Sequence, residues 1–312
     1  MAKAVFTTKV SPSYDDLPER RYHFPRTYLN QVQQALGDWI VYYEPRRSTG
    51  DVMSSGGRMA YFATARLAEI VPDPVKSDHF YALIDTATYL DFVDPVSFAD
   101  GDFYYESSLR KPDGSTNKGA FGRAVRVISD REYDTIWRAG FGGLIGLKQA
   151  VEAAPAPETE VPIARVADSR ASFEFETDRE VIEQLVSRPF RDRAFATAVK
   201  DAYGHTCAVT GLKIINGGGR SEVQAAHIRP VHDRGPDSVR NGIALCGTVH
   251  WMFDRGLLAI DENFSILSAH DRLPDTVQRL LPSNNRLLVP EREDLRPHPQ
   301  FLAYHRDHIF KG

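Results

Sequence analysis

The run 223–261 constrains the fold more than any other part of this 312-residue chain. It opens with a short apolar segment that ends at His227, and a polar loop rich in proline and glycine follows. Asn241 then precedes a second short apolar segment. His250 and Asp254 are four residues apart, so they share one face of a helix. The run therefore predicts a strand, a loop, a second strand and a helix.

These residue types suit the hydrolysis of a phosphodiester. That reaction needs an activated water, neutralisation of the phosphoryl charge and stabilisation of the leaving 3′ oxygen. His227 is expected to be the general base, because histidine exchanges protons near neutral pH. His250 and Asp254 are expected to hold a divalent metal, Mg²⁺ first, with Mn²⁺ or another transition metal as alternatives. Asp254 could instead cap the C-terminus of the helix or interact near Arg255. The products would be a 5′ phosphate and a 3′ hydroxyl.

A strand, a loop, a strand and a helix with His, Asn and His at these places resemble the HNH (ββα-metal) nuclease family. The tail NGIALCGTVHWMFDRGLLAID resembles the branch of that family often attached to restriction enzymes. FRDRAFATAVKDAYGHTCAVTG before the motif and LLVPEREDLRPHPQFLAYHRDHIF after it are similar to the same branch. The resemblance covers about residues 188–312. It implies a metal-dependent DNA endonuclease with His227, Asn241 and His250 as catalytic residues. Asn241 would brace the loop and orient the base.

The sequence departs from the family pattern in two places. Many members carry an acid or a histidine immediately before the base as a metal ligand, and this chain has Ala226 there. Glu222 or Gln224, on the same strand face, could substitute. Many relatives also bind a structural zinc through two Cys-x-x-Cys knuckles, of which this chain keeps only Cys207 and Cys246. Two thiolates do not close a tetrahedral site, so no structural zinc is expected.

The first part of the chain is expected to form a separate, β-rich domain. Short apolar runs alternate there with turns rich in Gly, Pro and Asp, which favours strands. The expected strands are 39–43, 59–70, 79–84 and 120–128, the expected helices 25–36 and 131–137, and residues 1–20 are expected to be irregular. The order of strand, Gly-rich loop, strand and aromatic stretch over residues 21–145 resembles the PUA-like superfamily, which includes EVE-type and SRA-type readers of modified bases.

This resemblance implies that the N-terminal domain recognises a modified base, with modified cytosine expected first. Such readers flip the base out and stack it between aromatic walls. Asp85 or Asp91 could accept from an exocyclic amine, or cap a turn instead. Candidates for the pocket are Trp39, Tyr42, Tyr43, Tyr61, Phe62, Tyr81, Asp85 and Tyr89. Candidates for contacts to the DNA backbone are Arg46, Arg47, Arg58, Arg191, Arg193 and Arg229.

The segment 150–164 is rich in Ala, Pro and Glu and has no apolar periodicity, as is typical of a linker. Helices are expected after it, at 178–186 and 190–203. The expected fold class is therefore α+β. The expected domains are a β-rich PUA-like domain at 1–149, a linker at 150–176, and an HNH (ββα-metal) nuclease domain at 177–312.

Charge and cysteine content indicate the setting in which the chain works. With 38 basic and 42 acidic residues it is no bulk nucleic-acid binder, so DNA contacts must come from local patches. One such patch is 188–255, with ten basic and six acidic residues. Two cysteines exclude a disulfide framework and fit a reducing compartment. No stretch is long and apolar enough to span a bilayer. A cytoplasmic protein with no membrane partner is expected.

Three functions stay open from the sequence. The first is a restriction endonuclease that cuts double-stranded DNA carrying modified bases. The second is a sequence-driven or nonspecific HNH nuclease. The third is a DNA-binding protein whose HNH fold has lost catalysis, for which Ala226 is the argument. One HNH site cuts one strand, so double-strand cleavage would need a homodimer or two sequential nicks.

Overall fold

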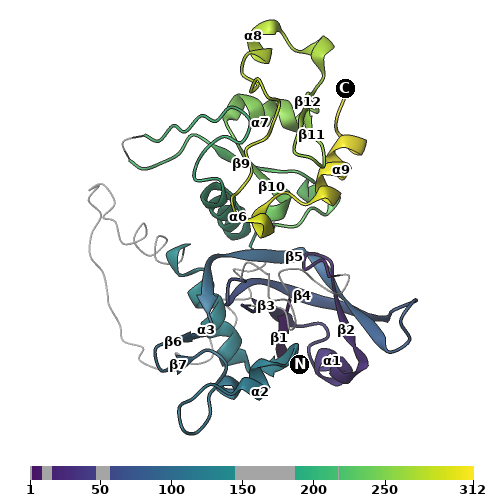
Figure 1. Ribbon diagram of the computed structural model, residues 1–312, viewed down its shortest axis with the longest axis vertical. Coiled ribbons are helices and arrows are strands. Elements are labelled where there is room, and N and C mark those ends of the chain that lie inside the picture. Colours follow the sequence, from purple (N-terminus) through teal and green to yellow (C-terminus); the bar gives the residue numbers. More distant parts are fainter. Residues whose placement is uncertain (1, 9–15, 47–56, 145–186, 217) are drawn as a thin grey trace, which may run out of the picture.

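The computed structural model describes residues 2–8, 16–46, 57–144, 187–216 and 218–312, which form two units stacked along the long axis of the molecule (Figure 1). The N-terminal unit, up to residue 144, is built on a six-stranded sheet. The C-terminal unit, from residue 187, consists of short strands surrounded by helices. This confirms the expected α+β class. The expected linker at 150–176 and the expected helix at 178–186 lie outside the described residues.

The N-terminal sheet is mixed, with the strand order β2-β5-β4-β3-β1-β8. Only the β1–β3 pair of this sheet is parallel among the described residues; the other pairs are antiparallel. Register shifts along β3, β4 and β5 curl the sheet. The strands are β1 (Lys3–Thr7), β2 (Arg21–Pro25), β3 (Trp39–Glu44), β4 (Ala60–Pro72), β5 (His79–Ser97) and β8 (Val125–Ile128). β5 runs along the side of this unit that faces the C-terminal unit (Figure 1).

Alternate residues of the strands fill two cores, one on each face of the sheet. In β3, Trp39, Val41 and Tyr43 belong to one cluster, while Ile40 and Tyr42 belong to the other, as the two-residue period of a strand requires. The helix α3 (Asp130–Gly140) covers the first cluster and begins with a capping box. The helix α1 (Leu29–Gln34) adds to the second. The remaining elements are η1 (Arg26–Tyr28), β6 (Ala99–Asp100), β7 (Phe103–Tyr104), η2 (Ser107–Leu109) and α2 (Lys118–Phe121).

Several expected elements of the N-terminal unit differ in the structure. Residues 1–20 are not uniformly irregular, because β1 pairs with β3 and β8 inside the sheet and buries its apolar residues. The strand expected at 79–84 continues to Ser97. Pro25 ends β2 and is also the N-cap of the 3-10 helix η1, so the expected helix begins as a 3-10 turn and becomes the α-helix α1 only at Leu29. The strand expected from Ala120 begins only at Val125, because α2 occupies the first residues.

The C-terminal unit has the predicted order of strand, loop, strand and helix. β9 (Gln224–His227) pairs antiparallel with β10 (Gly242–Leu245), and α7 (Gly247–Asp254) follows directly. The helix α6 (Arg188–Ala202) packs so closely on β10 that a Cβ on Gly242 would lie 2.4 Å from Val199. The other elements are η3 (Val231–Asp233), η4 (Val239–Asn241), β11 (Leu258–Ile260), β12 (Ile266–Ser268), η5 (His270–Arg272), α8 (Asp275–Gln278), η6 (Glu293–Leu295) and α9 (Pro299–His308).

Within the described ranges, none of the helices combines the length and the apolar character needed to cross a membrane.

Candidate active site

A surface pocket of about 470 Å³ lies where β9, α7 and α9 meet. His227 and His250 both line it, which brings the two histidines of the predicted motif to one place. The alternation of β9 puts Ala225 and His227 on the pocket side, while Ala226 is buried in the apolar core. The lining residues are Ala225, His227, Pro230, Val231, His232, His250, Trp251, Asp254, Arg255, His305 and Ile309.

His227 is held from two sides. Its ring stacks on Phe195 of α6, with the centroids 3.8 Å apart. Its Nε2 lies 2.9 Å from Oδ1 of Asp237. A carboxylate only accepts, so Nε2 carries the proton in the neutral imidazole and Nδ1 is left with the lone pair. Nδ1 is therefore the atom of His227 that can take a proton from a water.

Asp237 is fully buried among cations. Arg191 donates from Nε to its carboxylate at 2.8 Å, and Arg188 donates to both oxygens at 3.1 Å. Burial alone would raise the pKa of Asp237, but the hydrogen bond with His227 and the charges of Arg191 and Arg188 lower it to about 2. Asp237 is thus a carboxylate at neutral pH, and it fixes the orientation and the tautomer of His227.

Asn241 braces the loop that joins β9 to β10. Its Oδ1 accepts from the backbone N–H of Arg229 at 2.9 Å, and its Nδ2 donates to the carbonyls of Arg229 and Pro236, both at 3.0 Å. The loop also needs Gly235, since a Cβ there would lie 1.8 Å from the carbonyl oxygen of Arg229. These bonds run to loop backbone, so it is Asp237, and not Asn241, that orients His227.

His250 presents its Nε2 next to a carboxylate. Its Nδ1 lies 2.7 Å from Oε1 of Gln224, an acceptor, so that Nδ1 carries the proton and Nε2 is left with its lone pair. Nε2 lies 3.4 Å from Oδ2 of Asp254, one turn along α7. Glu222 is occupied elsewhere, because its Oε1 accepts from the backbone N–H of Gly247 at the start of α7.

This donor set fits a divalent cation. An imidazole nitrogen and a carboxylate oxygen stand side by side on one helical face, and the other imidazole nitrogen is held by a second residue, as metal-ligating histidines usually are. In the part of the chain that the structure describes, no group of three or more His, Cys, Asp or Glu surrounds a common point. A hard cation such as Mg²⁺ tolerates this, because it keeps several waters and also binds substrate phosphate.

The two cysteines at the positions of the family's zinc knuckles lie close together in the core. Cys207 and Cys246 are both buried and free, and their thiols are hydrogen-bonded. Burial raises the pKa of Cys246, and the neighbouring thiol of Cys207 adds to this. Both side chains belong to the hydrophobic cluster of the C-terminal unit. They therefore act as small apolar core residues in this structure, and the expected lack of a structural zinc stays a prediction.

Most of the aromatic residues expected in a base pocket are core residues. The rings of Trp39, Tyr42, Tyr43, Tyr61, Phe62 and Tyr89 are each at most 7% exposed and fill the two clusters of the N-terminal sheet. A flipped base could reach none of these rings without opening the core. Tyr81 and Asp85 are half-buried. Asp85 accepts from the backbone N–H of Ala87 and so caps a turn, the alternative that the sequence left open.

The arginines expected on the DNA backbone fall into three groups. Arg58 and Arg191 are engaged in ion pairs, the half-buried Arg58 with Glu44 and Asp294 and the buried Arg191 with Asp237, so neither is a free phosphate contact. Arg46 and Arg193 are exposed. Arg229 is half-buried over the ring of Tyr304. Arg47 lies outside the described residues.

Several residues in or behind the pocket were not predicted from the sequence. Asp237 lies in the polar loop, and nothing in its spacing from His227 marks it as a partner. Arg255 and the 59%-exposed Trp251 line the pocket beside the metal pair, and their place next to the His250–Asp254 repeat could have indicated them. His305 comes from α9, far along the chain, and no sequence signal points to it.

His305 predicts a specific loss of stability in acid. It is buried, stacks on Phe253 and donates from Nε2 to the carbonyl of Phe253. Burial lowers its pKa to about 4. In the unfolded chain this histidine has a pKa of roughly 6.5. Below that pH the unfolded chain binds a proton that the folded chain does not bind, which stabilises the unfolded state. The unfolding free energy therefore falls by up to about 3 kcal/mol between pH 6.5 and pH 4. Denaturant unfolding across this range measures it. His305→Gln should reduce the slope without abolishing it, because the pKa of His298 is also lowered to about 4, by burial first. The exposed control His308→Gln should leave the slope unchanged; equal slopes in all three proteins would contradict the assignment.

Comparison with known proteins gives one family match. Residues 207–261 match the HNH_2 family, described as HNH endonuclease. Among solved structures, a modification dependent TagI restriction endonuclease is similar at 16% identity, over 98% of this chain and 81% of that chain, with a TM-score of 0.31. At this low TM-score the likeness supports no conclusion about the fold or function of this chain. None of the curated proteins matches it. The segment from Cys207 to Asp261 is thus an HNH endonuclease domain, and the chain that carries it is a nuclease.

Proposed function

We propose that this chain is a metal-dependent endodeoxyribonuclease whose centre is the pocket between β9 and α7. One observation carries the proposal: a histidine oriented by a buried carboxylate and a histidine–carboxylate pair with a free ring nitrogen line the same pocket. HNH nucleases generally depend on a divalent metal. His250 and Asp254 are the residues that would hold it, and when bound it would neutralise charge on the scissile phosphate.

The protein residues carry the proton chemistry. Nδ1 of His227 takes a proton from a water, and the oxygen of that water attacks phosphorus as the bond to the 3′ oxygen breaks. Asp237 stabilises the imidazolium that forms. The 3′ oxygen leaves and acquires a proton from solvent, giving a 3′ hydroxyl and a 5′ phosphate. Arg255 lies on the pocket wall, where its charge favours binding of the phosphate.

The side chain of Gln224 is expected to control metal affinity without touching the metal. Because it holds Nδ1 of His250, its loss lets the ring rotate or change tautomer. Gln224→Ala should raise the Mg²⁺ concentration needed for half-maximal cleavage by about 10- to 100-fold. Gln224→Glu keeps an acceptor and should stay near wild type. A metal titration of initial rates measures both, and an unchanged midpoint in Gln224→Ala would remove His250 from the metal site.

The missing acid before the base does not favour an inactive protein. Ala226 is fully buried in the apolar cluster, so a carboxylate at that position would point into the core rather than into the pocket. The absence of an acid at position 226 therefore removes no metal ligand from the pocket. The catalytic proposal rests on the pocket side of β9.

The N-terminal unit is proposed to select the target, as a PUA-like domain at 1–149 that recognises a modified base, with modified cytosine first. The nuclease domain would occupy 177–312 and a linker 150–176. Since the expected pocket aromatics are in the core, an exposed aromatic surface is the better candidate for stacking. Phe103 of β7 is 53% exposed and packs edge-on against Tyr105. Exposed basic residues nearby in sequence, at 110, 111, 118 and 123, suit a DNA backbone.

The test is cleavage of four matched duplexes that contain cytosine, 5-methylcytosine, 5-hydroxymethylcytosine or glucosylated cytosine. Selective cutting of one modified duplex supports the reader and names its ligand. Equal cutting of all four would leave the nuclease and discard the modified-cytosine reader.

One centre of this kind cuts one strand. We infer that double-strand cleavage uses either a homodimer or two sequential nicks by one molecule. Sedimentation of the chain with and without DNA separates these, since a monomer under both conditions discards the dimer.

A further inference from the structure

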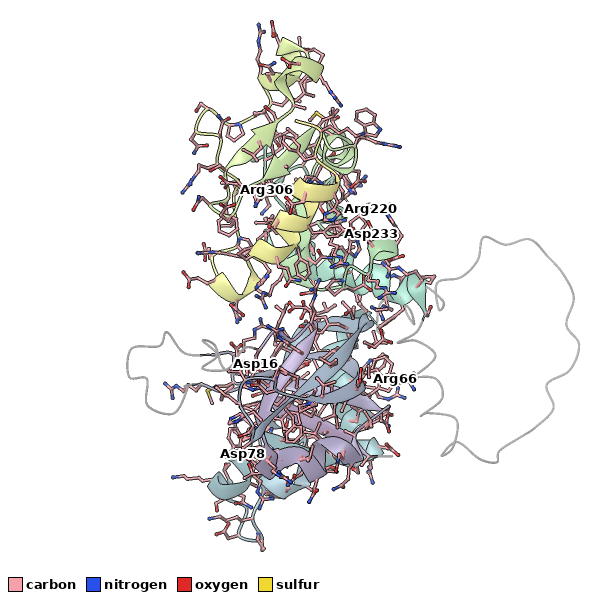
Figure 2. The ribbon with its side chains drawn as sticks, turned by 90° about the vertical axis from the view of Figure 1, so that its right-hand side faces the viewer. Asp16, Arg66, Asp78, Arg220, Asp233 and Arg306 are labelled. Carbon is pink, nitrogen blue, oxygen red and sulfur yellow. The ribbon has the colours of Figure 1, made fainter. Side chains whose placement is uncertain are left out.

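The loop that carries Asp237 is held from the other side by the N-terminal unit. Leu90 of β5 forms a parallel bridge with Asp237 itself. Two residues further along the loop, the backbone N–H of Val239 donates to Oδ2 of Asp91 at 2.7 Å. The sheet of the N-terminal unit therefore reaches the residue that orients His227. Figure 2 shows Asp233, in the same loop, in the half of the C-terminal unit nearest the N-terminal unit.

A second acid of the N-terminal unit, Glu19, holds the same segment. Glu19 is completely buried, and its carboxylate accepts from the hydroxyl of Ser238 at 3.1 Å. Arg240 donates to both Glu19 oxygens at 3.4 Å. Ser238, like Asp237, is buried between the units. Glu19 and Asp91 thus fix three consecutive loop residues that immediately follow Asp237.

Arg191, one of the two arginines that pair with Asp237, is also hydrogen-bonded to β5. Arg191 donates from Nε to Asp237 and from Nη2 to the carbonyl oxygen of Tyr89 at 3.0 Å. Phe190, the residue before it, packs against Trp137 and Phe141 of the N-terminal unit. The position of α6 behind His227 therefore also depends on contacts with the N-terminal unit.

We infer that Glu19 and Asp91 are positioning residues of the nuclease centre, so that the N-terminal unit completes the HNH site as well as adjoining it. This inference rests on the proposed role of His227. Neither acid touches the pocket. Each acts through the backbone and side chains of the segment 237–240, which sets where the Asp237 carboxylate meets the ring of His227. Asp91, a candidate base contact from the sequence, holds the nuclease loop instead.

Displacement of a positioned catalytic group by about 1 Å can cost about 100-fold in rate. In the full-length chain, Asp91→Ala and Glu19→Met should therefore lower kcat for DNA cleavage by about 10- to 100-fold. KM for DNA should stay unchanged, because neither residue is placed on DNA. Asp91→Asn should restore most of kcat, since an amide oxygen can still accept from Val239.

A matched control is available at the same interface. Asp294 pairs with Arg58 across the two units but makes no hydrogen bond to the segment 237–240. Asp294→Asn should therefore keep kcat. All variants are compared well below their unfolding midpoints, so that a global loss of stability does not enter the rates.

The inference is overturned if Asp91→Ala and Glu19→Met, both folded, keep a kcat no lower than that of Asp294→Asn. A rise in KM with unchanged kcat would also overturn it, because it would place the acids in DNA binding. If one of the two variants does not fold, the other decides alone. If neither folds, Ser238→Ala decides, because it removes the hydroxyl that donates to Glu19, and a wild-type kcat in that variant overturns the inference. Full activity of His227→Ala would instead overturn the proposed function, which separates the two failures.

Discussion

His227→Ala should cut DNA about 10²- to 10⁴-fold more slowly than the wild type, the range that a positioned general base contributes. Because Nε2 is hydrogen-bonded to Asp237, Nδ1 is the ring atom that can accept a proton, and alanine offers no such atom. The single-turnover rate at saturating Mg²⁺ measures the chemical step. DNA binding should persist, since the phosphate contacts proposed here do not include His227.

The control for this prediction is His205→Ala. His205 lies after α6, pairs with Asp201 and does not line the pocket, so its loss should leave the rate unchanged. A His227→Ala rate within a few-fold of wild type would move the base to another residue.

Asp237→Asn should be nearly as damaging to cleavage, by up to about 10⁴-fold, because an amide can donate to Nε2 and so favour the wrong tautomer of His227. It should also destabilise the fold. The carboxylate is buried, and its loss leaves the buried Arg191 without its counter-charge, which costs about 3–5 kcal/mol. Kinetics at low temperature and denaturant unfolding measure the two effects separately.

Asp233→Asn is the matched change in the same loop, because the side chain of Asp233 is partly exposed and contacts His232 and Tyr304 rather than His227. It should leave both the rate and the unfolding free energy near wild type. If Asp237→Asn cleaves at the wild-type rate while folded, the carboxylate does not set the tautomer of His227.

The sequence predicted the local framework of the nuclease site because that framework depends on short spacings. β9, β10 and α7 follow from two short apolar runs and a four-residue His–Asp repeat, and the structure brings His227 and His250 into one pocket. The partner of His227 could not be predicted in this way. Asp237 reaches the ring only because the loop folds back through Gly235 and the bonds of Asn241, and no periodicity encodes that path.

In the N-terminal unit the sequence indicated strands but not which residues their two faces bury. Most of its strands were predicted from short apolar runs between turns. The faces on which the aromatic residues lie were not predicted, because both faces of the sheet are covered by a core. Tyr42 and Tyr43 are therefore buried on opposite sides, although either could have lined a pocket. β1 was not predicted, because it is stabilised by pairing with β3 and β8, which lie far along the chain, rather than by its own composition.

The most direct test of the account is cleavage of an end-labelled duplex by the intact chain with and without Mg²⁺ or Mn²⁺, followed by analysis of the new ends. The account predicts metal-dependent cleavage that leaves 5′ phosphate and 3′ hydroxyl ends and that is lost in His227→Ala. Cleavage without metal, ends of the opposite type, or no cleavage of plain or modified duplexes with either metal would contradict it.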